Sequence, residues 1–418
     1  MAIFALVDCN NFYASCERLF QPKFNNKPLI VLSNNDGCVI ARSNEAKALG
    51  IIMGVPFFKV KALCQQHRVN VFSSNYVLYG DMSQRVMSVL SRYSPDMEVY
   101  SIDEAFLQLD KLPVEDYEAY ALQIRQYVFK CTGIPVSVGI GPTKTLAKLA
   151  NFIAKKQTQN GVFSLVGRAA QARVLPTISV GEVWGVGRQS VKKLDALGIF
   201  TVQELKEASL KWIKKQFSKV MERVIVELHG QVCLALEDVA PKQNICCSRS
   251  FGQLIDTEQG LAQALAYFVA RACYKARQQS SVAQALQIFV RTRLFNQANS
   301  YENSITIPLV SPTNDAVTLT KLAKEGLGKI FKSGYAYAKA GVLLLDLRDE
   351  RHAQSALFPE VVARSQQLMP LLDKVNKAMG QQSLFFLSEG IDKPFATNND
   401  YCSQRYTTCW REICVVGA

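Results

Sequence analysis

Apolar residues in the N-terminal part of the chain follow the spacing of a mixed sheet and its helices. Residues 3–7 form an unbroken apolar run that stops at Asp8, which predicts a strand buried on both faces. Later segments predict two strands, a helix, a strand and a second helix, in this order: 98–102, 105–110, 117–128, 135–140 and 144–155. With a helix near residues 12–20, the order is β-α-insert-β-β-α-β, the split βαβ or ferredoxin-like plan. The insert, about residues 27–80, is predicted to form a small separate lobe.

The rest of the chain begins with helices and then returns to the same plan. Residues 176–236 are helical in character and rich in Lys and Arg, and Thr201 with Glu204 matches a helix capping box. After a linker, strands and helices are predicted again in βαββαβ order: 246–251, 258–277, 286–293, 305–309, 315–332 and 340–345. The two βαββαβ units do not resemble each other in sequence, so they are not a repeat. The pattern predicts an α+β chain of several domains.

Composition adds an anionic partner to this picture. The 418 residues include 48 Lys and Arg against 35 Asp and Glu, a net charge of +13 that favours nucleic acid; the alternative is a basic protein with no such partner. Twelve cysteines are scattered without a CxxC pair, so we expect no zinc site and a reducing, cytoplasmic environment. No apolar run approaches the ~20 residues that span a bilayer, so no membrane association is expected.

Three carboxylates stand where the predicted strands end. Asp8 follows the first strand, and Asp103 and Glu104 lie between the next two. Because these strands are neighbours in a split βαβ sheet, the three side chains are expected to converge. Convergent carboxylates favour Mg²⁺, and two such ions about 3.5–4 Å apart stabilise the attacking and leaving oxygens of a phosphoryl displacement. The alternative is that Asp8 only begins a loop and the other two acids only form a turn.

The segments around these acids have a specific sequence. They read DCNNFYASCE at 8–17, SNNDGCVIAR at 33–42 and YSIDEAF at 100–106. The first and third resemble Y-family DNA polymerases, and the second resembles the branch of UmuC-type catalytic subunits of DNA polymerase V, with its plasmid-borne MucB and ImpB relatives. The resemblance runs along nearly the whole chain. It implies a bacterial, error-prone, template-directed translesion DNA polymerase without proofreading, which acts in SOS repair and mutagenesis.

The resemblance also implies how the chain is divided. A right-hand polymerase of this kind has a ferredoxin-like palm, small fingers, a helical helix-hairpin-helix thumb, a βαββαβ little finger and here a C-terminal segment. In this sequence the expected bounds are 1–26 with 81–166 for the palm, 27–80 for the fingers, 167–236 for the thumb, 244–350 for the little finger and 351–418 for the C-terminal segment.

Carried over by position, the resemblance assigns the acids to two Mg²⁺ ions. Asp8, Asp103 and Glu104 are implied as catalytic metal ligands, and the backbone carbonyl of Cys9 adds a fourth. A primer 3′-hydroxyl would attack the α-phosphate of a deoxynucleotide, and pyrophosphate would leave.

Residues around the incoming nucleotide are assigned in the same way. Tyr13 is implied as a steric gate against a 2′-hydroxyl, with Phe12 as the neighbouring wall; the alternative for both aromatic residues is core packing. Lys47 and Lys155 are implied as triphosphate ligands, although Lys47 departs from a family Arg and therefore lacks its bidentate fork. Asn44 occupies a nucleotide-contact position that is often Tyr. For Lys155 the alternative is a solvated helix face.

Two further segments are candidates for binding DNA. The sequence VWGVGR at 183–188 resembles a helix-hairpin-helix, whose glycines let the backbone approach a phosphate at the next helix N-terminus. A later predicted strand has a polar, basic face; the alternative there is ordinary surface charge. The candidate residues are Gly185, Gly187, Arg188, Lys192, Arg291 and Arg293.

Protein partners are also implied. Gln354, Leu357 and Phe358, within QSALF, resemble the pentapeptide by which bacterial polymerases bind the sliding clamp. The alternative is that Leu357 and Phe358 pin a tether onto the protein's own surface. The UmuC-type resemblance further implies a UmuD′-like dimer and a RecA filament as partners, beside primer-template DNA and deoxynucleotides.

Three other functions compete with this one. A non-catalytic DNA-binding protein on the same fold would be favoured by loss of an acid, but all three acids are present. A nucleotidyl transferase could select one nucleotide with its own side chains instead of the template. A nucleotide cyclase on a similar palm is disfavoured by the basic helical segment and the second βαββαβ unit.

Overall fold

The computed structural model describes residues 2–237, 240–293, 300–352, 364–380, 382–393 and 395–414. The chain forms two compact units. The first comprises Met1–Ser33, Gly37–Asp238 and Tyr401–Ala418, and the second comprises Asn34–Asp36 and Val239–Asp400. The described helices include none with the length and apolar character of a membrane span.

A five-stranded sheet lies at the centre of the first unit, in the order β5-β6-β1-β7-β8. Its middle strand, β1, pairs antiparallel with both β6 and β7, and β7 pairs parallel with β8. The split βαβ order predicted from the sequence is therefore confirmed. The strands are β1 (Phe4–Cys9), β5 (Met97–Val99), β6 (Glu104–Gln108), β7 (Val136–Gly141) and β8 (Val162–Ser164).

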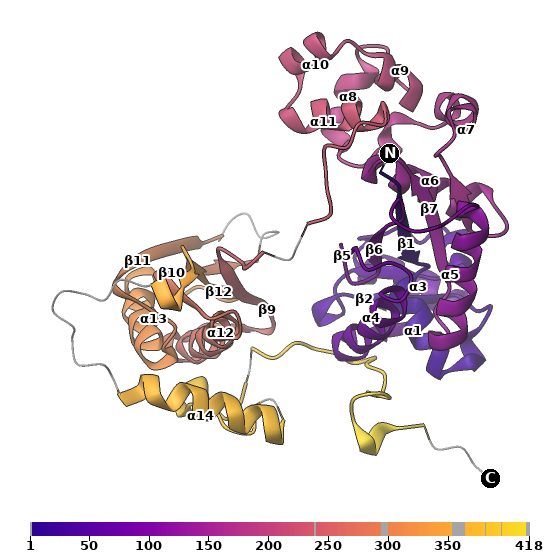
Figure 1. The fold of residues 1–418 in the computed structure, drawn as a ribbon. Helices are drawn as coiled ribbons and strands as arrows, with labels where there is room; N and C mark the ends of the chain where they lie inside the picture. Colours follow the sequence, from indigo (N-terminus) through magenta and orange to yellow (C-terminus); the bar gives the residue numbers. More distant parts are fainter. Residues whose placement is uncertain are drawn as a thin grey trace. The chain divides into compact units, whose positions relative to one another are not determined.

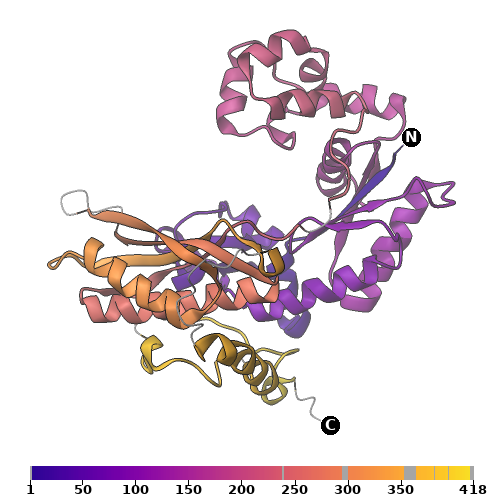
Figure 2. The ribbon, with the colours of Figure 1, turned by 60° about the vertical axis from the view of Figure 1, so that its left-hand side comes forward.

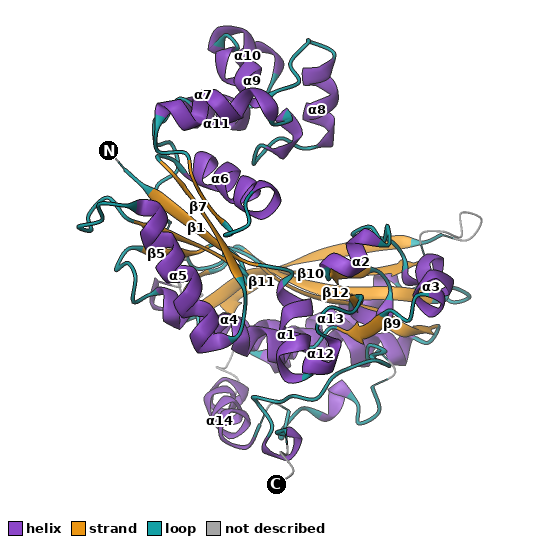
Figure 3. Ribbon diagram, turned by 90° about the vertical axis from the view of Figure 1, so that its right-hand side faces the viewer, coloured by secondary structure: helices purple, strands orange, loops and turns teal. Residues whose placement is uncertain are grey.

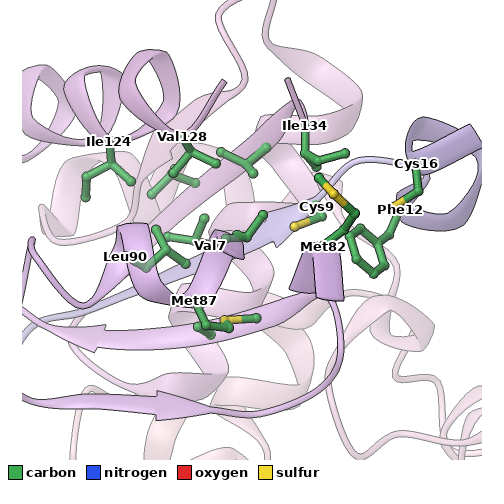
Figure 4. Packing of buried hydrophobic residues seen from close by; sticks show 14 of the residues in the cluster. Val7, Cys9, Phe12, Cys16, Met82, Met87, Leu90, Ile124, Val128 and Ile134 are labelled. Carbon is green, nitrogen blue, oxygen red and sulfur yellow. The ribbon is translucent and has the colours of Figure 1, made fainter. Parts of the chain in front are cut away.

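Helices cover both faces of this sheet (Figure 3). Ala5 and Val7 of β1 point into a core that they share with helices α1, α4 and α5. Figure 4 shows part of this core. Phe4 and Leu6 point to the opposite face of the sheet and pack with Ala147 of helix α6. Such burial on both faces is what the unbroken apolar run predicts. The helices are α1 (Phe12–Phe20), α4 (Tyr76–Leu90), α5 (Tyr117–Thr132) and α6 (Lys144–Gln157).

Helix α6 lies very close to β7 because Gly139 has no side chain. A Cβ at Gly139 would lie 2.0 Å from the backbone nitrogen of Asn151 and 2.5 Å from the carbonyl oxygen of Ala147. The buried Asn151 side chain then donates hydrogen bonds to the carbonyls of Leu6 (3.2 Å) and Ser137 (2.9 Å). These contacts fix α6 against β1 and β7, and with it the two lysines, Lys148 and Lys155, that pair with acids of the site described below.

The insert forms a three-stranded sheet in the order β3-β2-β4 with its own apolar core. The boundary expected near residue 80 falls inside α4, which begins at Tyr76 and packs on the larger sheet. The elements of the insert are β2 (Leu29–Leu32), β3 (Val39–Arg42), α2 (Asn44–Ala48), α3 (Phe57–Gln66) and β4 (Asn70–Ser73).

Short helices follow β8 and enclose a third apolar core, to which α6 also contributes. The capping box predicted at Thr201 and Glu204 is confirmed, with both reciprocal hydrogen bonds present at the start of α9. These helices are α7 (Arg168–Val174), α8 (Arg188–Asp195), α9 (Val202–Glu207), α10 (Leu210–Gln216) and α11 (Lys219–Leu228).

The second unit contains a sheet in the order β11-β10-β12-β9, with β13 paired to β10. Helices α12 and α13 lie side by side on one face of this sheet (Figures 1 and 2) and share its core. Arg277 of α12 forms a bidentate ion pair with Asp373 of α14. The elements are β9 (Ile245–Ile255), α12 (Glu258–Gln278), β10 (Ser281–Thr292), β11 (Glu302–Thr313), α13 (Ala316–Ile330), β12 (Tyr337–Leu345), β13 (Arg348–Asp349) and α14 (Arg364–Met379).

Candidate active site

The three predicted acids meet at one end of the β1–β6 pair. Asp8 and Glu104 are cross-strand partners in the antiparallel register. The backbone N–H of Cys9 donates to the carbonyl of Asp103 over 2.8 Å, which places Asp103 beside the end of β1. Asp8 lies within β1 instead of after it and is buried, whereas Asp103 and Glu104 are half-buried. The sheet topology thus brings together acids that are far apart in the sequence.

Two lysines of α6 balance these carboxylates. The ammonium group of Lys155 lies 2.5 Å from Asp8 Oδ2, and that of Lys148 lies 3.1 Å from Glu104 Oε2. Burial raises the pKa of Asp8 to about 7; the nearby Lys155 lowers it, and the charge of Glu104 raises it further. A buried carboxylate of this kind favours a cation next to it.

Lys148 was not singled out by the sequence analysis as a site residue. Its ammonium group lies 4.2 Å from the ring centroid of Tyr100 and 5.4 Å from that of Trp184, in addition to its ion pair with Glu104. The sequence feature that could have identified Lys148 is its helical spacing from Lys144 and Lys155. Residues four and seven apart share a helix face, so all three lysines point to one side of α6.

The donor set suits a hard divalent cation. In the part of the chain that the structure describes, no three His, Cys, Asp or Glu side chains form a ready-made metal cage. Mg²⁺ is usually held by one or two protein carboxylates together with substrate phosphates. Burial and the neighbouring Asp8 raise the pKa of the Cys9 thiol far above its usual range, so Cys9 can offer only its carbonyl oxygen. Asp103 is oriented by Ser101, whose hydroxyl donates to Asp103 Oδ1 over 2.6 Å.

A second group of polar residues lies at the start of α1. Asn11 has a left-handed backbone (φ 49°) and precedes the first turn of the helix. Its side chain donates to Asn44 Oδ1 over 3.1 Å and accepts from the Lys47 ammonium group over 2.5 Å. The Lys47 ammonium group also donates directly to Asn44 Oδ1 over 3.3 Å, so Asn44, Lys47 and Asn11 form one hydrogen-bonded group. The sequence analysis quoted Asn11 but gave it no role.

Positive charge gathers around Lys47. Burial lowers the pKa of Lys47, and the charges of Arg42, Lys155 and Lys156 lower it further. Cations that destabilise one another in this way are stabilised by an anion with several charges. A triphosphate is such an anion.

Phe12 and Tyr13 have different surroundings. Phe12 is 4% exposed and packs into the core in Figure 4, so its side chain is placed as a core residue. Tyr13 is half-buried, and its ring stacks on Tyr79 with centroids 4.3 Å apart and planes at 16°. Tyr76 meets Tyr13 edge-on at 6.2 Å. Tyr13 therefore keeps one part of its ring accessible.

The candidate DNA-binding residues lie on two separate units. Gly185 has a left-handed backbone (φ 89°), Gly187 is the N-cap of α8, and Arg188 and Lys192 of that helix are exposed. The segment before them is a single 3₁₀ turn, Val180–Glu182, in place of a full first helix. In the second unit, Arg291 is half-buried on β10, and Arg293 just beyond it is exposed. Gln354, Leu357 and Phe358 lie outside the described residues.

Comparison with known proteins agrees with this fold. The model of the impB/mucB/samB family matches residues 7–151, and that of the same family's C-terminal domain matches 242–357. A domain of unknown function matches residues 366–416. Among solved structures, a chimeric Y-family DNA polymerase has a TM-score of 0.65 at 20% identity, covering 82% of this chain and 99% of its own.

Two of the relatives extend over nearly the whole chain, and a third extends over most of it. Protein UmuC of Salmonella typhimurium is 44% identical over 418 residues, covering 98% of this chain and 99% of the relative. Protein ImpB of Salmonella typhimurium is 43% identical over 419 residues, with the same coverage. DNA polymerase IV of Corynebacterium diphtheriae is 28% identical over 369 residues, covering 85% of this chain and 77% of the relative.

The family models and the relatives of 43–44% identity define the chain as a Y-family DNA polymerase of the UmuC type. Within that class, the chain belongs to the impB/mucB/samB family, and it is similar to UmuC along nearly its full length. It is an error-prone translesion DNA polymerase of SOS mutagenesis, and it acts on primer-template DNA with deoxynucleotides and a divalent metal.

Proposed function

We propose that Asp8, Asp103 and Glu104 are the catalytic acids of this polymerase and that, with the Cys9 carbonyl, they hold two Mg²⁺ ions. The observation that carries the proposal is the cross-strand register of Asp8 and Glu104, with Asp103 bonded to the end of the same strand. Bound Mg²⁺ would acidify the primer 3′-hydroxyl and neutralise charge on the reacting phosphates.

The cations around the acids would bind and orient the nucleotide. Lys47 and Lys155 lie in the cluster of positive charge described above and would hold the triphosphate, with Arg42 and Lys156 adding to its field. Asn44 would fix the position of Lys47 directly and through Asn11. Orientation of this kind supplies much of the rate enhancement in phosphoryl transfer, because little covalent chemistry is left to the protein.

Sugar selection would fall to Tyr13. Its ring is held by Tyr79 and Tyr76, and a rigid ring can exclude a 2′-hydroxyl where a mobile one would give way. Phe12, buried in the core, would form the wall that fixes the backbone of Tyr13.

The proposed division into parts follows the elements. The β5-β6-β1-β7-β8 sheet would be the palm, the β3-β2-β4 lobe the fingers, α7–α11 the thumb and the sheet of the second unit the little finger. Exposed Arg188 at the start of α8 and exposed Lys192 in its last turn would bind DNA phosphates, as would Arg291 and Arg293 of the second unit.

Partners are proposed from the sequence pattern and from family membership. Gln354, Leu357 and Phe358 would bind the sliding clamp, with the two apolar residues as anchors. A UmuD′-like dimer and a RecA filament would be the activating partners.

Primer extension with each deoxynucleotide tested singly, on four templates that differ in the next base, tests the proposal. A template-directed polymerase inserts the complementary nucleotide on each template. The same nucleotide inserted on all four would instead support a transferase that selects with its own side chains. No insertion, with or without the proposed partners, would support a non-catalytic DNA-binding protein.

A further inference from the structure

A short C-terminal stretch is bonded to the first unit at the start of α4. We call it the strap and define it as residues 401–406. The backbone N–H of Ser73 donates to the carbonyl of Tyr401, and the N–H of Tyr401 donates to the Ser73 hydroxyl, each over 3.0 Å. Asn75, the N-cap of α4, donates to the carbonyl and the hydroxyl oxygen of Ser403 over 3.2 and 3.1 Å. The strap therefore joins the polar start of α4.

The other end of the strap enters the core. Tyr406 is buried among the core residues and stacks on Phe20 of α1, with centroids 4.8 Å apart and planes at 13°. The Gln21 side chain donates to the Tyr406 hydroxyl over 2.9 Å. The strap is thus fixed at both ends, and Ser403 lies between the two anchors.

Ser403 begins a chain of contacts that ends at Tyr13. Its hydroxyl donates to Oε1 of Glu17 over 3.0 Å, and the Tyr79 hydroxyl donates to the same oxygen over 2.6 Å. Glu17 and Tyr79 are fully buried. The ring of Tyr79 is the one on which Tyr13 stacks. Two buried side chains therefore connect the strap to the proposed sugar gate.

The buried carboxyl depends on these two donors. Among the residues that the structure describes, no donor reaches the other oxygen of Glu17, Oε2. Burial raises the pKa of Glu17 to about 7, which the two hydrogen bonds partly offset. A buried polar group that loses one of two partners moves to find another or is left unsatisfied. Loss of the Ser403 donor would therefore let the Glu17 carboxyl shift, and with it the Tyr79 hydroxyl bonded to it and the ring that supports Tyr13.

We propose that the strap positions the sugar gate: Ser403, acting through Glu17 and Tyr79, holds the ring of Tyr13 in the orientation that excludes a 2′-hydroxyl. Ser403 and Glu17 are positioning residues, since they act through Tyr79. The inference rests on the proposed role of Tyr13. It gives a function to part of the segment that matches a domain of unknown function.

The test compares kcat/KM for a deoxynucleotide and for the matching ribonucleotide in the full-length protein. Ser403→Ala removes the hydroxyl that donates to Glu17, whereas Ser403→Thr keeps a hydroxyl at this position. Tyr79→Phe removes the second donor to Glu17 but keeps the ring on which Tyr13 stacks. Thr408→Ala, a hydroxyl deletion at an exposed position just beyond the strap, is the matched control. Tyr13→Ala, alone and combined with Ser403→Ala, completes a double-mutant cycle.

We expect Ser403→Ala and Tyr79→Phe each to lower the deoxynucleotide preference roughly threefold to tenfold, the size of one lost supporting hydrogen bond. Ser403→Thr should keep most of the wild-type preference for the deoxynucleotide, and Thr408→Ala should keep all of it. In the Tyr13→Ala background, Ser403→Ala should add nothing. If Tyr13→Ala lowers the preference while Ser403→Ala and Tyr79→Phe do not, the strap inference is wrong and the gate stands. If Tyr13→Ala itself leaves the preference unchanged, the gate assignment fails and the inference fails with it.

Discussion

Glu17 offers a prediction about stability that is separate from catalysis. Its side chain is fully buried and its pKa is raised from 4.5 to about 7, chiefly by burial. The titratable groups around it are Cys16, Tyr79 and Tyr406, none of which supplies a positive charge. The folded first unit therefore prefers Glu17 to be protonated.

The sign and size of the effect follow from the two pKa values. Below about pH 4.5 the carboxyl is protonated in both the folded and the unfolded chain, so it adds no pH dependence. Between about pH 4.5 and 7 the unfolded chain releases the proton first, and the free energy of unfolding falls as the pH rises. Since one pKa unit corresponds to about 1.4 kcal/mol, the full loss is on the order of 3 kcal/mol.

Glu17→Gln removes the titration while keeping an acceptor for Tyr79 and Ser403. The new amide nitrogen would lack a partner, which adds a cost that does not depend on pH. The decisive quantity is therefore the change in stability between pH 5 and 8. Between these two pH values the free energy of unfolding of the Glu17→Gln variant should fall less than that of the wild type, by up to about 3 kcal/mol.

Urea unfolding followed by tryptophan fluorescence measures this change for the first unit, because Trp184, Trp212 and Trp410 all belong to it. Glu118→Gln, a change at an exposed glutamate of the same unit, is the control and should unfold with the wild-type pH profile. If Glu17→Gln also keeps the wild-type profile, the reasoning about the buried carboxyl is wrong.

Three further changes test the proposed site and partners. Tyr13→Ala should admit ribonucleotides much more readily; an unchanged ratio of kcat/KM for dNTP over rNTP would leave Tyr13 as a packing residue. Lys155→Ala should raise the KM for deoxynucleotides roughly tenfold or more, because a charge-assisted contact is lost; steady-state kinetics with an unchanged KM would contradict its phosphate role. Replacing Leu357 and Phe358 by Ala should remove clamp-stimulated synthesis on long primed DNA, and surviving stimulation would refute clamp binding, whereas a large loss of stability would show that these residues pack on the protein itself.

The strands and helices could be predicted where local pattern and tertiary packing agree. The apolar run before Asp8 gave β1, and the T-x-x-E pattern at Thr201 gave the start of α9. Both depend on residues close together in the sequence. The pairing of Asp8 with Glu104 could be predicted because the split βαβ plan restricts which strands are neighbours.

Contacts that depend on the tertiary arrangement could not be predicted. Lys144 occupies a polar position of α6, yet it is buried in an ion pair with Glu98, a partner that helical spacing cannot identify. The bond between Ser403 and Glu17 joins residues that are 386 positions apart, in a segment without helical or strand periodicity. Such contacts become visible only once the sheet and helices have been placed.

Single-turnover nucleotide insertion by Asp103→Asn tests the central claim most directly. Asp110→Asn is the matched control: Asp110 lies near the opposite end of the β1–β6 pair, where its carboxylate accepts from the backbone N–H of Ile3 over 3.3 Å. With Mg²⁺ present, insertion by Asp103→Asn should fall at least about a thousandfold, ~4 kcal/mol of transition-state stabilisation, because a metal ligand is lost. Primer-template binding by both variants, and insertion by Asp110→Asn, should stay close to wild type. Insertion by Asp103→Asn within a few-fold of wild type would contradict the assignment of the catalytic acids.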